Sequence, residues 1–359
     1  MSKSHLHGLI LAGGRGTRFW PRSRTQAPKQ LLSFLGEQSL IQETVDRLAP
    51  MIPVENIWVL TNSHLEKEIR RQLPGVPKEQ IIAEPAQRNT APCLGLAAQV
   101  LFERDPDAVL GVFPADHHIG RPVRFRQWMK PAFKAAAAGK LVTLGIAPRW
   151  AETGYGYLEF PKGIAPGHAQ PVTLRRFREK PDLKTAQKFI KAGNYFWNAG
   201  IFFWRAGAFL NAMRQHLPKS AALLAALPRF GERGFASRLA EAYPLCENIS
   251  VDYGIMEKSD NVVGLATDDF GWNDLGSWNA VYELLARDAA GNASRSPMIS
   301  DGARGNYVEA PGKLVALVGV DDLVVVDTPD ALLVVHRSQA QRVGQLVKQL
   351  EASGRHELL

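Results

Sequence analysis

Two patterns of apolar and polar positions alternate in the first third of the chain. Short apolar runs, typical of buried strands, alternate with stretches in which apolar residues recur every three or four positions, as on one face of a helix. The predicted strands are Gly8–Gly13, Ile57–Asn62, Gln80–Pro85 and Ala108–Asp116, and the predicted helices are Ser39–Pro50, His64–Leu73 and Thr90–Asp105. Because such alternation forms a parallel sheet with helices on both faces, we predict a Rossmann-like α/β fold.

Between residues 122 and 282 the pattern is more mixed. Helices are expected between further strands, which are predicted at Leu141–Ile146, Gly156–Phe160, Val172–Lys180 and Ala199–Ala206. We therefore expect a mixed sheet flanked by helices.

The last part of the chain has shorter, more closely spaced β-like runs. Residues Ala286–Ser300 are small and polar and predict a linker. The runs after it, without a convincing internal repeat, are Asn306–Pro311, Lys313–Val320, Asp322–Pro329 and Ala331–Arg337. A terminal helix is predicted at Ser338–Ser353, with an apolar face of Val343, Leu346, Val347 and Leu350. We expect a large domain over residues 1–288 and a small β-rich domain, a sheet or solenoid turn, over residues 289–359.

Composition and charge narrow the class of protein. With 45% hydrophobic and 22% charged residues, the chain is typical of globular proteins, and its two cysteines lack the spacing of a disulfide framework or a zinc site. No signal peptide or bilayer-spanning segment is visible, so we expect a cytoplasmic protein without a membrane partner. The net charge of +8 is scattered along the chain, and we expect no nucleic-acid partner.

The glycine-rich segment Gly13–Arg18 follows the first predicted strand. Its glycines let backbone amides approach phosphate oxygens, and Arg15, Arg18 and Lys29 add cations that repel one another unless an anion is bound. The segment lacks the Lys-Ser or Lys-Thr pair of a Walker A loop, and Phe19 stands where the dinucleotide fingerprint has a glycine. A plain structural turn or a solvated basic loop is the alternative interpretation.

Two aspartates are candidate magnesium ligands. Asp116 ends a predicted strand, and Asp274 lies in a loop that opens a helix. Mg²⁺ prefers one or two carboxylates together with phosphate oxygens and water. The alternative is that both aspartates are helix caps.

Polar residues beside glycines and aromatics in the middle of the chain suit a sugar site. Glu179 and Asn198 could hydrogen-bond hydroxyl groups, and Lys180 could hold a phosphate. Singly, each of these residues is more often structural than functional.

Together these segments resemble the sugar-phosphate nucleotidylyltransferases, and most closely the bacterial mannose-1-phosphate guanylyltransferases. The segments that carry the resemblance are LAGGRGTRFWPRSRTQAPKQ, AEPAQRNTAPC, FPADHHI, TGYGYLEF, REKP, FWNAGIFFW, SVDYGIMEKSDNV and WNDLGSW. Small departures occur, because Phe19 and Arg22 stand where leucine is usual, and Asn273 and Leu275 replace a common Ser and Val.

This resemblance implies a GT-A-like nucleotidyltransferase domain and a small β-helix-like domain. It implies transfer of GMP from GTP to α-D-mannose 1-phosphate, giving GDP-mannose and pyrophosphate. The implied catalytic residues are Arg18, Lys29, Asp116 and Asp274, of which the two aspartates would hold Mg²⁺. The implied nucleotide-binding residues are Leu11, Ala12, Gly13, Gly14, Arg15, Gly16, Thr17, Glu84, Pro85, Arg88 and Asn89. The implied sugar-phosphate-binding residues are Gly156, Glu179, Lys180, Asn198 and Asp252.

Several alternatives stay open on the sequence. The chain could use another sugar 1-phosphate, such as glucose 1-phosphate with a different nucleotide, or act as a non-catalytic nucleotide-sugar sensor. The 59 residues after Ser300 are too few for an isomerase domain of cupin type, so no phosphomannose isomerase activity is expected. The apolar terminal helix and β tail could form a homodimer interface, and Arg22 and Arg24 are expected to face solvent.

Overall fold

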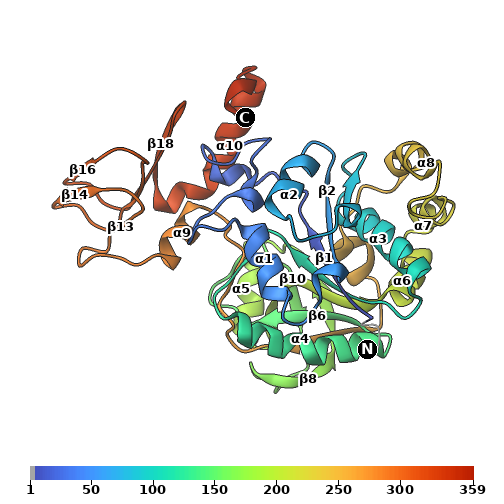
Figure 1. The fold of residues 1–359 in the computed structure, drawn as a ribbon. Helices are drawn as coiled ribbons and strands as arrows, with labels where there is room; N and C mark the ends of the chain where they lie inside the picture. Colours follow the sequence, from blue (N-terminus) through green and yellow to red (C-terminus); the bar gives the residue numbers. More distant parts are fainter. Residues whose placement is uncertain (1–4) are drawn as a thin grey trace. The chain divides into compact units, whose positions relative to one another are not determined.

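The computed structural model describes residues 5–359, which form two compact units (Figure 1). The larger unit contains residues 5–12, Thr44–Pro114 and Ile119–Trp272. The smaller unit contains Gly13–Glu43, Ala115–His118 and Asn273–Leu359. Both units are therefore assembled from segments that lie far apart in the sequence.

A mixed sheet forms the centre of the larger unit. Its strands lie in the order β3-β2-β1-β4-β10-β6-β11-β8, and β7 pairs with β10 and β9. The bounds are β1 (Leu6–Leu11), β2 (Ile57–Asn62), β3 (Ile81–Glu84), β4 (Val109–Pro114), β6 (Leu141–Ile146), β7 (Tyr157–Glu159), β8 (His168–Thr173), β9 (Arg176–Arg178), β10 (Tyr195–Arg205) and β11 (Val262–Ala266). The first four strands are parallel, as predicted, and β10 is antiparallel to both β4 and β6. The predicted α/β fold with a mixed sheet is confirmed.

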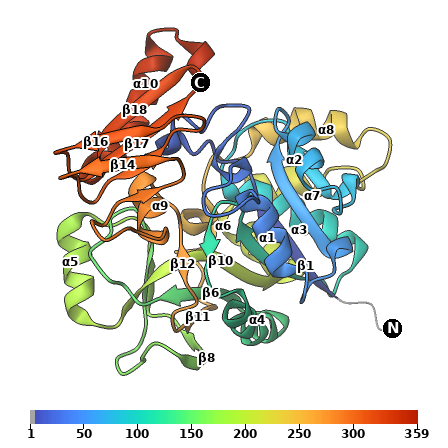
Figure 2. The ribbon, with the colours of Figure 1, turned by 60° about the vertical axis from the view of Figure 1, so that its left-hand side comes forward.

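Helices cover both faces of this sheet (Figure 2). Neighbouring residues on a strand point to opposite faces, and β4 shows the consequence. Leu110 and Val112 belong to the core cluster that also contains residues of α3 and α6, whereas Phe113 packs edge-on against Phe125 of α4. The helices of this unit are α2 (Glu66–Gln72), α3 (Thr90–Arg104), α4 (Pro122–Ala137), α5 (Leu183–Ala192), α6 (Ala206–His216), α7 (Pro218–Ala225) and α8 (Phe235–Ala242), with short 3₁₀ turns at Val54–Asn56, Lys78–Gln80 and Tyr243–Leu245 and a π-helix at Asp252–Met256.

The prediction of one strand over Val172–Lys180 is wrong. The chain leaves β8 at Thr173 and enters β9 at Arg176, because it changes partners there. Strand β8 pairs with β11, whereas β9 pairs with β7. A continuous run of β-favouring residues does not reveal such a change of partner.

Parallel coils of β-structure make up much of the smaller unit. Strands β13, β15 and β17 pair in parallel with β18 antiparallel at the end, and β14 pairs in parallel with β16. The bounds are β13 (Ala293–Ser294), β14 (Met298–Asp301), β15 (Tyr307–Glu309), β16 (Val315–Val318), β17 (Leu323–Thr328) and β18 (Ala331–His336). This confirms the predicted small β-rich region near the end of the chain.

These coils repeat in backbone structure, which the sequence analysis, finding no convincing internal repeat, did not predict. The strand register aligns Gly291, Gly305 and Asp322, which all adopt positive φ angles of 80°, 65° and 54°. The spacing changes from 14 to 17 residues, and an aspartate takes the third glycine position. Both irregularities hide the repeat in the sequence.

The predicted linker Ala286–Ser300 is also wrong, because it belongs to the first coil. Asn292 donates to the Ala303 carbonyl (3.0 Å) and accepts from the Asn306 backbone amide (2.9 Å). Small and polar residues suit this position, since a buried asparagine can satisfy the backbone groups of adjacent coils.

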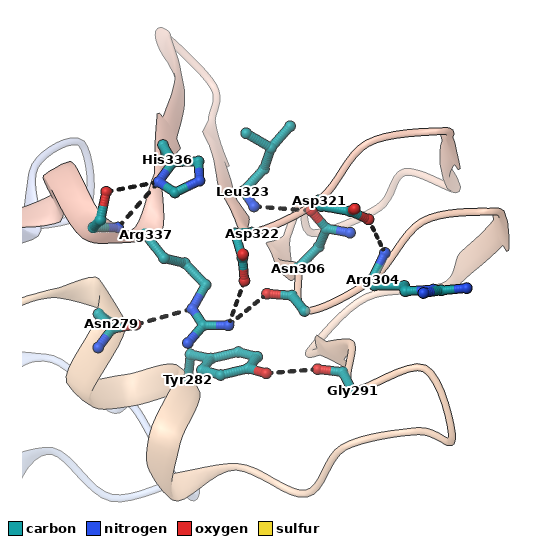
Figure 3. A network of polar contacts seen from close by, with 12 residues as sticks. Asn279, Tyr282, Gly291, Arg304, Asn306, Asp321, Asp322, Leu323, His336 and Arg337 are labelled. Carbon is teal, nitrogen blue, oxygen red and sulfur yellow. Dashed lines mark hydrogen bonds and ion pairs between the residues drawn. The ribbon is translucent and has the colours of Figure 1, made fainter.

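The side chain of Arg337 connects the coils to α9 (Trp278–Leu284) through several polar and aromatic contacts. The guanidinium lies over the Tyr282 ring, 3.6 Å from its centroid, and Nε donates to Asn279 Oδ1 at 2.9 Å (Figure 3). Its Nη1 donates to the Gly305 carbonyl (2.9 Å) and to Asp322 Oδ1 (3.0 Å). One side chain thus joins a helix to two successive coils.

Aromatic packing attaches the glycine-rich segment to the same unit. The ring of Phe19 lies 4.7 Å from that of Phe34 and 5.2 Å from that of Trp278, and Trp278 also contacts Tyr307. The other short elements here are η1 (Thr17–Phe19), η2 (Lys29–Leu31), η7 (Arg337–Arg342), α10 (Val343–Ala352) and η8 (His356–Leu358). Helix α1 (Leu40–Leu48) and strands β5 (His118–Ile119) and β12 (Trp272–Asn273) span the junctions between the units.

None of the helices between residues 5 and 359 has the length and apolar character needed to cross a membrane.

Candidate active site

The glycine-rich loop of the smaller unit packs closely on Lys29. Gly16 has a φ of 61°, and a Cβ atom there would overlap the Cβ of Lys29. Gln30 Nε2 donates to the Gly14 carbonyl at 2.9 Å. Glycine is therefore required at position 16 both for its backbone conformation and for this close approach.

The ammonium group of Lys29 brings the two predicted metal ligands together. Its Nζ donates to Asp116 Oδ2 at 2.9 Å and to the backbone carbonyl of Asp274 at 2.5 Å. The Lys29 side chain is only 6% exposed, so this cation is held in place by its surroundings. The structure thus groups three of the four predicted catalytic residues.

The carboxyl of Asp116 has a lowered pKa. Burial alone would raise that pKa, but the Lys29 ammonium, together with His117, outweighs burial and favours the ionised form. Asp116 still exposes 37% of its side chain. An ionised, partly accessible carboxylate is the state that a magnesium ligand requires.

The Asp274 carboxylate lies over Gly276. A Cβ at Gly276 would stand 3.0 Å from Asp274 Oδ2, so the glycine leaves space for the carboxylate. Among the described residues there is no group of three or more His, Cys, Asp or Glu side chains arranged to hold a metal. Two aspartates nevertheless fit the hard-oxygen chemistry of Mg²⁺, which takes its remaining ligands from phosphates and water.

The arginines of this segment have separate partners. Arg15 pairs with Glu351 at 2.7 Å, and Arg18 donates to Gln341 Oε1 at 2.7 Å. Thr17 lies between these two arginines in the loop.

Arg22 and Arg24, predicted to face solvent, do not. Arg22 pairs with Glu309 at 2.5 Å and lies over the Phe34 ring, while Arg24 pairs with Asp330 at 2.7 Å. Their partners lie about 300 positions away in the chain, so no local pattern could reveal these ion pairs.

A second polar cluster lies in the larger unit and contains the predicted sugar-binding residues. Asn198 Nδ2 donates to Asp252 Oδ1 at 3.1 Å, and Lys180 Nζ pairs with Glu179 Oε1 at 3.0 Å. A Cβ at Gly156 would overlap the Glu179 carboxylate and stand 3.2 Å from Asn198 Cβ. The structure therefore brings all five predicted sugar-site residues together.

Irregular backbone positions this cluster. Strand β10 shifts its register against β6 between Asn198 and Phe202, and Gly200 there has a φ of 67°. Asp252 opens the π-helix, and Lys180 itself has a φ of 42°. Strained or irregular backbone of this kind is frequent at functional sites.

Two further residues complete the cluster, and the sequence analysis did not single them out. Thr143 donates to Asn198 Oδ1 at 2.8 Å, and Glu257 Oε1 accepts from the Glu179 backbone amide at 2.7 Å. Thr143 is the one polar residue in the apolar run Leu141–Ile146, which is a signal that sequence reasoning could have used.

The carboxyl groups of this cluster resist ionisation. Burial, and then the charge of Glu179, raise the pKa of Asp252 to about 7. Burial also raises the pKa of Glu179, although Lys180 opposes that shift. Burial disfavours the charged form of Lys180, but the Glu179 carboxylate outweighs it and raises the pKa of that ammonium.

The predicted nucleotide-base residues lie at the end of β3 and just after it. Glu84 is buried, accepts from the Tyr243 hydroxyl at 2.5 Å, and has a pKa raised chiefly by burial. Arg88 Nε donates to the Pro244 carbonyl at 2.7 Å, and Asn89 caps α3 by accepting from the Thr90 amide. Pro85 is exposed.

Leu11 and Ala12 are the last predicted nucleotide-binding residues. Leu11 ends β1, and the Ala12 amide donates to the Leu60 carbonyl at 2.8 Å. Because β1 to β4 are parallel, their carboxyl ends lie at one edge of the sheet, where ligands bind in such folds.

Comparison with known proteins places this arrangement in a family. The nucleotidyl transferase family model matches residues 7–291, and a model for the mannose-phosphate isomerase/GMP-like β-helix domain matches residues 299–350. The chain is 39% identical to the mannose-1-phosphate guanylyltransferase of Escherichia coli strain K12, over 99% of this chain and 76% of that protein. It is also 39% identical to the mannose-1-phosphate guanylyltransferase ManC of Salmonella typhimurium, over 99% of this chain and 75% of that one.

A solved structure is similar over nearly the whole chain. It is titled a mannose-1-phosphate geranyltransferase from Thermus thermophilus, and it has a TM-score of 0.85 and 32% identity over 97% of this chain and 100% of that one. This chain belongs to the nucleotidyl transferase family, in the branch that contains the mannose-1-phosphate guanylyltransferases.

Proposed function

We propose that this chain transfers GMP from GTP to α-D-mannose 1-phosphate, giving GDP-mannose and pyrophosphate. The observation that carries the proposal is Lys29, whose buried ammonium contacts Asp116 and the Asp274 carbonyl beneath a glycine-rich loop. The relatives at 39% identity carry the name of this activity. A cation and two carboxylates around a phosphate-binding loop suit phosphoryl-group chemistry.

In the proposed reaction, a phosphate oxygen of mannose 1-phosphate attacks the α-phosphorus of GTP. The new P–O bond forms as the bond to the β-phosphate oxygen breaks, and that electron pair leaves with pyrophosphate. The attacking phosphate is already ionised at pH 7, so no general base is required. Positioning and neutralisation of charge therefore account for catalysis, with Arg18 and Lys29 binding the phosphates.

We further propose Mg²⁺ as the divalent cation, held by Asp116 and Asp274. The lowered pKa of Asp116 favours its ionised form, and Asp274, whose carboxylate lies over Gly276, is partly exposed. When bound, the ion neutralises triphosphate charge. The chain's own residues would orient it, because Lys29 holds the Asp116 carboxylate and the backbone of Asp274 through direct hydrogen bonds.

Residues Leu11–Thr17 would bind the triphosphate, and Glu84, Pro85, Arg88 and Asn89 would lie at the guanine side. Sugar recognition is assigned to Gly156, Glu179, Asn198 and Asp252, with Lys180 at the sugar phosphate. The close contacts among these five residues support a single sugar site.

A panel of substrates tests the proposal. The purified chain is incubated with Mg²⁺, each of the four NTPs and either mannose 1-phosphate or glucose 1-phosphate, and pyrophosphate release is followed. Release should be fastest with GTP and mannose 1-phosphate. Faster release with another pair would assign other substrates, and binding of GDP-mannose without any release would indicate a sensor.

The proposal also includes the domain bounds, the location and the oligomeric state. We propose a catalytic domain over residues 1–288 followed by a β-helix-like domain over residues 289–359. A cytoplasmic location is proposed because Cys93 and Cys246 are buried free thiols. A homodimer is also proposed, and its mass in sedimentation would test it.

A further inference from the structure

The carboxyl-terminal segment, residues 341–359, contacts the glycine-rich segment Gly13–Arg18, and both belong to the smaller unit. Glu351 Oε1, on α10, lies 2.7 Å from Arg15 Nη2, and Gln341 Oε1, just before α10, accepts from Arg18 Nη1 at 2.7 Å. Close packing accompanies these bonds, because a Cβ at Gly344 would stand 3.4 Å from Arg18 Cγ. The helix therefore lies directly against the loop that is proposed to bind the triphosphate.

The two polar contacts differ in charge. Gln341 is neutral, so it holds the Arg18 guanidinium in one position and leaves its positive charge available to an anion. Glu351 is a carboxylate and neutralises Arg15 with the same kind of charge that a phosphate would bring. Gln341 therefore holds Arg18 in place for a phosphate, whereas Glu351 takes the position on Arg15 that a phosphate would take.

Both contacts are exposed to solvent, so a bound anion can alter them. Arg15 and Glu351 expose 45% and 35% of their side chains, and Arg18 is also exposed. A solvent-exposed ion pair changes an equilibrium by about twofold to fivefold and weakens with salt. A triphosphate, which carries several charges and binds loop amides as well, can displace Glu351 from Arg15.

We propose that Gln341 is a positioning residue that holds Arg18 for the triphosphate, and that Glu351 competes with the triphosphate for Arg15. The carboxyl-terminal segment thereby sets the affinity of the loop for nucleotide. This inference rests on the proposed function, because it requires that GTP phosphates bind at Gly13–Arg18.

Two substitutions with opposite expected effects test the inference. Glu351→Gln keeps the shape of the side chain and removes its charge, so GTP should bind about twofold to fivefold more tightly. Gln341→Ala should weaken GTP binding by a similar factor and raise the KM for GTP, while the KM for mannose 1-phosphate and the melting temperature stay unchanged. Binding is measured by calorimetry with GTP and Mg²⁺ alone, and the KM values by pyrophosphate release.

Matched controls lie on the same segment. Glu357→Gln removes a carboxylate that pairs with Arg355, and Gln345→Ala truncates an exposed glutamine of α10. Neither should change GTP affinity. The gain from Glu351→Gln should also shrink when the salt concentration rises from about 0.05 to 0.5 M, since screening weakens an exposed ion pair.

The outcomes separate this inference from the proposed function. If the unsubstituted chain turns over GTP and mannose 1-phosphate but neither substitution changes GTP affinity, the inference alone is overturned. Equal losses in both variants would also overturn it, because they would indicate a purely structural helix. If the unsubstituted chain neither binds nor uses GTP, both the proposed function and the inference fail.

Discussion

Two lysine–carboxylate clusters, one in each unit, have similar side chains and opposite electrostatics. In the smaller unit, Lys29 contacts Asp116, and the pKa of that carboxyl is lowered. In the larger unit, Lys180 contacts Glu179, and the pKa of the neighbouring Asp252 rises to about 7. The surroundings therefore favour the ionised form of one aspartate and disfavour the ionised form of the other.

Burial raises the pKa of both aspartates, and the difference follows from whether the neighbouring charges outweigh that burial. Lys29 bonds directly to one carboxylate, with His117 adding to the favourable field around it. The Lys180 ammonium bonds to Glu179, while the charge of Glu179 itself disfavours ionisation of Asp252. An ionised cluster suits a cation and a triphosphate, whereas a part-protonated cluster can both donate to and accept from sugar hydroxyls.

The largest expected effect comes from Asp274→Asn. This change removes a negative charge from the ionised cluster and keeps the backbone carbonyl that accepts from Lys29. We expect kcat to fall by about 10² to 10³, as for loss of one preorganised contact, with little change in melting temperature. Asp301→Asn, at an exposed position on β14, is the control. Equal losses of activity and melting temperature would instead identify Asp274 as a structural cap.

Removing the cation tests the electrostatic comparison more directly. Lys29→Met should lower kcat by about 10² and destabilise the fold by about 1 to 2 kcal/mol, because it leaves the ionised Asp116 without its ammonium partner. That cost is smaller than for a fully buried pair, since 37% of the Asp116 side chain is exposed.

A double variant separates stability from activity at this cluster. Adding Asp116→Asn to Lys29→Met removes the unpaired charge, so urea unfolding should show part of the stability restored while kcat stays low. A double variant less stable than Lys29→Met alone would show that Lys29 does not stabilise Asp116.

Only part of the Lys29 cluster could be predicted from local sequence patterns. Asp116 could be placed because it follows an apolar strand, and the parallel order of β1 to β4 was predictable from alternating periods. The contact of Lys29 with both Asp116 and Asp274 joins residues 87 and 245 positions apart, which local patterns do not encode. The resemblance to a known family supplied that grouping.

Other features could not be predicted either, because they also depend on contacts between residues far apart in the chain. The partners of Arg22 and Arg24 are distant ion-pair acceptors, and the coil repeat is disguised by the replacement of glycine with Asp322. The pKa of Asp252 depends on its burial and on the charge of Glu179, which follows β9 and lies far from the π-helix of Asp252 in the sequence. The ion pairs and the pKa values therefore depend on which residues meet in the folded chain, and composition does not determine this.

A smaller effect, confined to the larger unit, is expected from Gly156→Ala. The added Cβ would overlap the Glu179 carboxylate, which must move and thereby lose its present contact with Lys180. We expect the KM for mannose 1-phosphate to rise about tenfold, equivalent to about 1.4 kcal/mol, with the KM for GTP nearly unchanged. Gly154→Ala on the same loop, where a Cβ comes no closer than 3.2 Å to Glu152, is the matched control. A similar rise in both KM values would show that this glycine does not act on the sugar site.

The last expected effect is on stability rather than on activity, as a change in pH dependence in Asp252→Asn. The pKa of an unfolded aspartate is about 3.9, and that of folded Asp252 is about 7, so the folded state holds this proton more tightly. The proton therefore stabilises the fold fully below about pH 4, and the free energy of unfolding should decline as the pH rises towards 7. Asparagine cannot ionise, so the variant should lack this decline.

Urea unfolding at pH 5 and pH 8 measures the difference between the two proteins. Relative to the unsubstituted chain, Asp252→Asn should gain on the order of 2 kcal/mol between these pH values, less than an isolated carboxyl would give because Glu179 shares the proton. Asp116→Asn should show no such difference between pH 5 and pH 8, because a carboxyl with a lowered pKa is ionised in both the folded and the unfolded chain there, and its contribution is lost only as the pH falls below about 4. Parallel pH profiles for the two variants would contradict the comparison, because they would require both aspartates to have the same charge in the folded chain.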